Sequence, residues 1–242
     1  LFTSLKDHTP ADGVTRFAIN SRQWQDGATA EHWAAFPKLS AATLHSTPRP
    51  IPGFVYWHNF RMHFPKDAVL MRTLSLDGVR LETQLLHYDG VDWLPYTYAW
   101  RDDQTDADLV PADGGEKEIR QDGKTRVWQY HSRSQCMSCH SNQSEYALSF
   151  LPEQLNRAGS DGRNQLVALS ESGYIRRAGD DGQPLPPFDA ASAARQSKVA
   201  DPADESQPLA ARARAYLHAN CGHCHSDHGG GSVPLRMQFS TP

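Results

Sequence analysis

All four cysteines of the 242-residue chain lie in two pentapeptides of the form Cys-x-x-Cys-His, CMSCH at 136–140 and CGHCH at 221–225. Two intervening residues place a pair of thiols where they can bond to the two vinyl groups on one edge of a porphyrin. A histidine directly after the second cysteine falls beneath the ring, where its imidazole can bind iron. The repeated pattern is therefore a signature of c-type haem attachment.

Six residues of the two pentapeptides have expected roles in holding two covalently bound haem c groups. The expected thioether-forming residues are Cys136, Cys139, Cys221 and Cys224, and the expected proximal iron ligands are His140 and His225. No other residue type or spacing marks a catalytic acid or base, so the sequence predicts no catalytic group.

Two other chemistries also use pairs of cysteines. Four thiolates from two Cys-x-x-Cys pairs can bind one structural zinc ion. Each pair alone can form a redox disulfide at the start of a helix. Neither chemistry requires a histidine after each second cysteine, so haem attachment is the preferred interpretation while both alternatives remain open.

The second axial ligand of each iron does not follow from the spacing of the motifs. The segment 56–64 (YWHNFRMHF) gathers His58 and His63 among aromatic side chains, and Met237 follows the second motif closely enough to fold back over it. These are the candidate distal ligands, although both histidines also suit an ordinary surface and the methionine suits a core. A thioether ligand raises the reduction potential and an imidazole lowers it, whereas an open position lets peroxide or oxygen bind.

The residues before the first motif predict an antiparallel, β-rich region at 1–130. Alternating or aromatic-rich runs predict strands at 69–76, 80–88, 93–101 and 125–130. Asp-Gly pairs lie between several of these runs and are typical of tight turns. Short strands joined in this way favour a sandwich or a small barrel.

The residues from 131 to 242 predict a mainly helical, loop-rich region like a cytochrome c, so that the expected fold class is mixed α+β. Helices are expected at 151–157, 164–172 and 206–220. Asn164 suits the N-cap of the second helix and Gly173 lies just past its end. Residues 179–208, rich in glycine, proline and aspartate, predict an extended connection.

Composition and charge exclude several classes of partner. The formal net charge is −4 and the sequence pI is about 6.3, with no basic stripe, so a nucleic-acid partner is not expected. No apolar run approaches the roughly 18 residues of a membrane helix, so no integral membrane segment is expected. The chain begins at Leu1 without an apolar leader, which fits either a removed signal peptide or a fragment of a longer protein.

Several stretches, taken in order, resemble a family of exported bacterial di-haem c-type cytochromes. The resemblance covers roughly residues 60 to 242 and is carried by LETQL at 81–85, YTYAW at 96–100, DDQTDA at 102–107, SRSQCMSCH at 132–140, NQL at 164–166 and YLHANC leading into the second motif at 216–225. The ordered series is more specific than the haem motifs alone.

This resemblance implies export, haem attachment in the periplasm and a role in electron transfer. It carries over the six attachment and proximal residues and assigns no distal ligand. Members of the family continue beyond the second motif with more helix, whereas this chain ends at Pro242. Either the sequence is truncated, or the β-rich region or a second molecule is expected to cover the second haem.

Three functions fit these observations. The leading hypothesis is an electron carrier of the periplasm or the cell exterior, with a redox partner such as a dehydrogenase or another cytochrome. The alternative is a di-haem enzyme of the peroxidase or oxidase type, which needs one open haem beside acid–base residues. A third hypothesis makes the β-rich region a docking module, and self-association is a variant of it.

Overall fold

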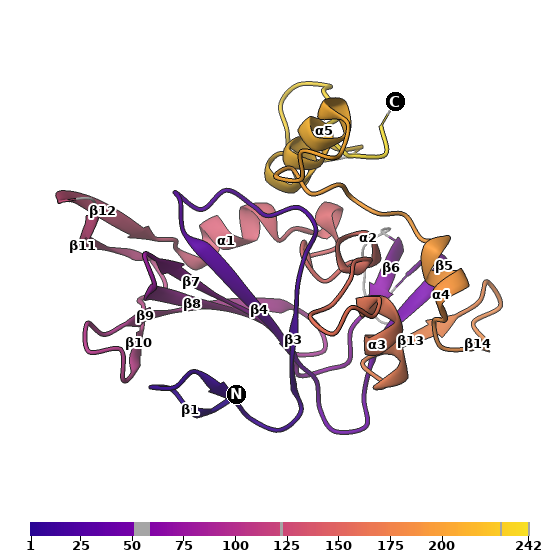
Figure 1. Cartoon of the computed structure of the whole chain (residues 1–242), viewed down its shortest axis with the longest axis horizontal. Coiled ribbons are helices and arrows are strands. Elements are labelled where there is room, and N and C mark those ends of the chain that lie inside the picture. Colours follow the sequence, from indigo (N-terminus) through magenta and orange to yellow (C-terminus); the bar gives the residue numbers. More distant parts are fainter. Residues whose placement is uncertain (51–58, 122, 228, 242) are drawn as a thin grey trace. The chain divides into compact units, whose positions relative to one another are not determined.

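The computed structural model describes residues 1–50, 59–121, 123–227 and 229–241 of the chain (Figure 1). Strands make up 35% of the described residues and helices 17%, so the structure is mainly β. The chain forms two compact units that alternate along the sequence. The first unit comprises Leu1–Arg16, Gln25–Phe36 and Asp67–Ser138, and the second comprises Phe17–Trp24, Pro37–Lys66 and Cys139–Pro242.

The prediction of a mainly helical, cytochrome c-like region at 131–242 is wrong. The helices of this region are α1 (Arg133–Cys139), the 3-10 turn η1 (Asn142–Ser144), α2 (Pro152–Leu155), α3 (Gln165–Glu171), α4 (Ala190–Ala194) and α5 (Leu209–Asn220). Only α5, with 12 residues, is longer than two turns. Glycine, proline and aspartate separate these helices and favour turns over continued helix.

The first unit is built on a six-stranded sheet with the order β10-β9-β8-β7-β4-β3. Its strands are β3 (Val14–Phe17), β4 (Thr29–Ala35), β7 (Ala68–Leu76), β8 (Val79–Tyr88), β9 (Trp93–Trp100) and β10 (Ala107–Leu109). The predicted strands at 69–76, 80–88 and 93–101 are confirmed. Asp77 and Gly78 both have positive φ (51° and 82°), which is the geometry that a two-residue hairpin between β7 and β8 requires.

A hairpin lies against each face of this sheet. On one face, β11 (Gly115–Gln121) and β12 (Lys124–Tyr130) bring Trp128 into a buried cluster with Leu74. Thr73 precedes Leu74 and so points to the opposite face. There it lies 3.2 Å from Nε2 of His8, next to the hairpin of β1 (Phe2–Ser4) and β2 (Thr9–Pro10).

The second unit contains a four-stranded sheet with the order β14-β13-β5-β6. Its strands are β5 (Ala42–Pro50), β6 (Asn59–His63), β13 (Ile175–Ala178) and β14 (Pro184–Leu185). The β5 strand pairs with β6 in the antiparallel sense and with β13 in the parallel sense. Because of the second pairing, residues from the first quarter of the chain belong to the same unit as its C-terminal half, whereas the sequence suggested one boundary near residue 130.

The α3 helix has the ends that its sequence predicts. The Asn164 side chain accepts a hydrogen bond from the Leu166 N–H at 2.9 Å, as an N-cap does. Gly173 follows the C-cap Ser172 with a φ of 78° and turns the chain towards β13. None of the helices in the described part of the chain is long and apolar enough to span a membrane.

A carboxyl group lies in the core of the first unit. Glu82 is 1% exposed, and its Oε2 has no hydrogen-bond partner among the residues that the structure describes. Burial raises the pKa of Glu82 above its ordinary value, and the hydrogen bond from Gln84 opposes this only in part. Burial and the nearby Glu82 also raise the pKa of Tyr130, to about 12.

We expect Glu82 to make the protein less stable as the pH rises. Folded protein retains a proton that the unfolded chain releases above its ordinary pKa of 4.5, so the free energy of unfolding falls between that pH and the raised pKa. The loss is about 1.4 kcal/mol for each unit by which the pKa is raised. The free energy of unfolding, measured with urea at about pH 5 and about pH 8, should fall less between these pH values in Glu82→Gln than in wild type.

The exposed Glu118, on the β11 strand of the same unit, supplies the matched control. Glu118→Gln should keep the wild-type dependence on pH. Equal pH dependence in wild type and Glu82→Gln would show that the buried carboxyl does not govern it.

Candidate functional site

The first Cys-x-x-Cys-His motif is formed by α1 and the residue that follows it. Ser132 and Gln135 form a reciprocal cap at the start of this helix: Ser132 N–H donates to the Gln135 side chain at 2.8 Å, and Gln135 N–H donates to the Ser132 hydroxyl at 3.2 Å. Cys136 and Cys139 are three residues apart in the helix, so they lie on the same side of it. All four cysteines of the chain are partly exposed, and none forms a disulfide in the described structure.

The His140 imidazole is oriented by a hydrogen bond. Its Nδ1 lies 2.5 Å from the backbone carbonyl oxygen of Tyr146. A carbonyl oxygen can only accept, so Nδ1 carries the proton and Nε2 keeps the lone pair that can bind a metal. The Ser144 hydroxyl donates to the Cys139 carbonyl at 2.6 Å and ties the same loop to the end of α1.

The second motif forms a turn at the C-terminal end of α5. Cys221 is the C-cap of the helix, and its carbonyl accepts hydrogen bonds from the N–H groups of Cys224 at 3.1 Å and His225 at 2.8 Å. A Cβ atom on Gly222 would lie 2.7 Å from the His218 carbonyl oxygen. Only glycine therefore fits at the position directly after the first cysteine of this turn.

The His225 side chain has different surroundings from His140. Its Nδ1 is buried and has no hydrogen-bond partner in the parts of the chain that the structure describes. A Cβ atom on Gly231 would lie 2.9 Å from this nitrogen, and the Gly231 N–H donates to the Cys224 carbonyl at 3.0 Å. The glycine-rich segment after the motif therefore packs directly on the imidazole.

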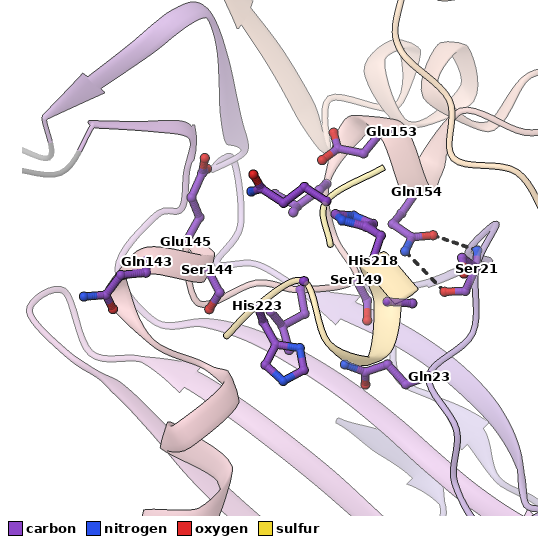
Figure 2. Close-up of a pocket in the computed structure, with 15 residues that line it drawn as sticks. Ser21, Gln23, Gln143, Ser144, Glu145, Ser149, Glu153, Gln154, His218 and His223 are labelled. Atoms are coloured by element: carbon purple, nitrogen blue, oxygen red, sulfur yellow. Dashed lines mark hydrogen bonds between the residues drawn. The ribbon is translucent and has the colours of Figure 1, made fainter. Parts of the chain in front are cut away.

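The segment Phe17–Trp24 holds α5 on the second unit. The Ser21 hydroxyl donates to the Ala215 carbonyl at 2.9 Å, and the Trp24 N–H donates to the Asn220 side chain at 2.6 Å. Ser21 is in turn held by Gln154, whose amide accepts from its N–H at 2.8 Å and donates to its carbonyl at 3.2 Å (Figure 2). These bonds fix the residue that precedes Cys221.

The candidate distal ligands from the sequence have separate locations. His58 lies outside the described residues. His63 is on β6, and its Nε2 lies 3.1 Å from the Arg49 carbonyl oxygen. The centroid of its ring is 4.4 Å from that of the His45 ring. The Met237 N–H donates to the His225 carbonyl at 2.8 Å, so the chain does return to the second motif.

A cavity of about 120 Å³ lies within the second unit, beside the second motif. Figure 2 shows Gln143, Ser144 and Glu145 on one side of it and Ser21 and Gln154 on the other. The further residues that line it are Gln23, Leu148, Ser149, Leu151, Glu153, His218, Ala219, Gly222, His223 and Gln238. The loop after His140 and the turn of the second motif thus line the same cavity.

The ionisable groups of this cavity have shifted pKa values. Burial raises the pKa of Glu145 and the pKa of Glu153. Burial, together with the neighbouring His223, lowers the pKa of His218 to about 4. Sequence reasoning missed both carboxyl groups because neither belongs to a motif, and only the fold brings them together.

The residues of both motifs fit a covalently attached haem. Each motif offers two thiols and one imidazole, and at the first a hydrogen bond from Nδ1 already fixes the imidazole. No group of three or more His, Cys, Asp or Glu side chains is placed to hold a metal ion in the described part of the chain. No protein family model, no curated protein and no solved structure matches the chain.

We expect a methyl group at Gly231 to displace the His225 imidazole. Gly231→Ala would place its Cβ within 2.9 Å of Nδ1, and overpacking of this kind costs about 1–3 kcal/mol. The side-chain NMR resonances of His225 should shift, and the melting temperature should fall. Gly230→Ala is the control, because its Cβ meets no described atom within 4 Å. Equal effects of the two substitutions would contradict this packing.

Proposed function

We propose that the protein is a di-haem c-type cytochrome that transfers electrons in the periplasm or outside the cell. The observation that carries the proposal is the hydrogen bond from His140 Nδ1 to the Tyr146 carbonyl. A metal-binding histidine characteristically donates its other ring nitrogen to a carbonyl or carboxylate, which fixes its tautomer and raises its basicity. This arrangement occurs directly after a Cys-x-x-Cys pair, where the proximal ligand of a c-type haem is required.

At the first site, Cys136 and Cys139 would form the thioethers, and Nε2 of His140 would bind the iron. The α1 helix keeps the two thiols on one side, while the loop that carries Tyr146 holds the imidazole. At the second site, Cys221, Cys224 and His225 would have the same roles. A bound haem supplies a metal centre that gains and loses one electron.

The exposed side chains of α5 support a large apolar cofactor at the second site. This helix buries only Ala215 and Ala219, while Tyr216 is 45% exposed and Leu217 is 37% exposed. Both exposed residues lie within the last turns before Cys221. Apolar side chains of this kind would cover a porphyrin face and keep water from it.

The proposed role requires a redox partner protein, such as a dehydrogenase or another cytochrome. Residues 59–241 contain no basic stripe that would suit a nucleic acid, and the formal charge of the whole chain is −4. Self-association is a further possibility within the same role, with a second molecule covering the second haem. Export accompanies the proposal because haem c is attached outside the cytoplasm in the family that the chain resembles.

The cavity beside the second motif favours a second candidate function, a di-haem enzyme of the peroxidase or oxidase type. Such an enzyme needs groups that move protons next to an open iron site. Glu145 and Glu153 line this cavity together with His218, and burial raises the pKa of each carboxyl, which favours the protonated form that a proton donor needs.

Removing either pair of cysteines should remove one covalent haem. Cys136→Ala/Cys139→Ala and Cys221→Ala/Cys224→Ala each delete both thioethers of one site, so the mass of the denatured protein should fall by one haem in each. The pyridine haemochrome absorbance should fall by half. A purified double variant that keeps two covalent haems contradicts the assignment, and wild-type protein that holds zinc and no haem favours the zinc alternative.

Carbon monoxide should distinguish the carrier from the enzyme. A carrier has two six-coordinate irons, so its reduced absorption spectrum should show low-spin bands that carbon monoxide does not change. An enzyme has an open or labile site, and one haem should then bind carbon monoxide. We expect no change with carbon monoxide, as for a carrier. Binding of carbon monoxide by one haem would contradict the carrier and favour the enzyme.

A further inference from the structure

We propose that Glu145 is a positioning residue that sets the reduction potential of the first haem. It would act through the Tyr146 carbonyl, which accepts the hydrogen bond of His140. This inference rests on the proposed function, because the potential exists only with a haem at Cys136 and Cys139. The positioning of the His140 imidazole through Glu145 does not itself require a bound haem.

The turn that presents this carbonyl has an unfavourable backbone conformation. Glu145 and Tyr146 are consecutive residues with positive φ, 54° and 57°, although neither is glycine. Side chains with a Cβ rarely adopt this left-handed region, and a pair of them persists only where the surroundings hold it. The Tyr146 N–H donates to the Ser141 carbonyl at 3.0 Å, and the Ala147 N–H of the following peptide donates to the Glu145 carbonyl at 2.6 Å, so backbone hydrogen bonds close the loop.

The Glu145 side chain links this turn to β6. Its Oε2 accepts a hydrogen bond from the Arg61 N–H of β6 at 3.0 Å. The ring of Phe60, next on the same strand, lies 6.2 Å from the Tyr146 ring in an edge-on arrangement. The left-handed turn is therefore held against β6 at both of its residues, by the Glu145 carboxyl group at one and by an aromatic contact at the other.

The turn at Glu145 and Tyr146 determines how strongly Nε2 of the imidazole donates electrons. A carbonyl held within hydrogen-bond distance of Nδ1 draws the ring proton towards itself and makes Nε2 a stronger electron donor. A stronger donor stabilises oxidised iron and lowers the reduction potential. Releasing the turn should weaken the hydrogen bond to His140 and raise the potential of the first haem, while the second haem should keep its own.

Two conservative substitutions separate position from charge. Glu145→Gln loses the charge but keeps an oxygen at the same distance from the backbone, so it can still accept from the Arg61 N–H. Glu145→Asp keeps the charge but is one methylene shorter and cannot reach that N–H. If Glu145 acts by position, Glu145→Asp should change the reduction potential of the first haem, whereas Glu145→Gln should keep the wild-type potential.

The experiment measures the two reduction potentials by spectroelectrochemistry in wild type and both variants. Glu145→Asp should shift the oxidation equilibrium of one haem about tenfold, which is about 59 mV for one electron. Glu145→Gln should leave it near the wild-type value. Glu153→Gln, which neutralises the other carboxyl of the cavity, is the control and should not reproduce the effect of Glu145→Asp. A shift in Glu145→Gln but not in Glu145→Asp would overturn the proposal in favour of a simple charge effect.

A second readout does not require haem. The Nδ1 proton of His140 should give a downfield NMR signal in wild-type protein and in Glu145→Gln, and this signal should weaken or vanish in Glu145→Asp. If the purified wild-type protein carries no haem but the three proteins still differ in this way, the proposed function is contradicted and the positioning role is supported. An unchanged signal in Glu145→Asp would overturn the positioning role, whether or not haem is attached.

Discussion

The second unit depends on two buried glutamine side chains that hydrogen-bond the backbone of the segment Phe17–Trp24 as a neighbouring strand would. Gln154 and Gln165, which are 3% and 8% exposed, each accept and donate a backbone hydrogen bond, the first with Ser21 and the second with Ala18. A single such bond contributes about 1 kcal/mol, but a buried polar group without its partner costs about 1–3 kcal/mol. Because α5 is held through Ser21, the location of the second motif follows from these two glutamines.

The two motifs share a pattern but have different local support. At the first, a peptide carbonyl holds the His140 imidazole; at the second, the His225 imidazole lies against Gly231. The orientation of the iron ligands and the hydrogen bonds that those ligands make are among the factors by which a protein sets the potential of haem iron. Two sites of equal ligand type but unequal support would therefore differ in potential, and such a difference gives electron flow a direction.

Local features of the fold could be predicted from the sequence, whereas its long-range pairings could not. The ends of α3 and the turn at Asp77 depend on residues within one turn of the chain, so Asn164 and Asp-Gly signals are sufficient. The parallel pairing of Ala42 with Ile175 joins residues far apart in sequence and leaves no local pattern. The same limit applies to the site: the cysteine spacing predicts the ligands, but only the fold brings β6 to the loop after the first motif.

A β-rich structure is compatible with haem attachment because the two thioether bonds make retention of the cofactor independent of an enclosing helical domain. Function resides in a site, and unrelated folds can carry the same site. What the fold must supply is one oriented imidazole and an apolar surface for each ring. Here a helix of seven residues and a loop pinned to a strand provide the first oriented imidazole, so the constraint on the chain is local stiffness around His140 and not a particular arrangement of helices.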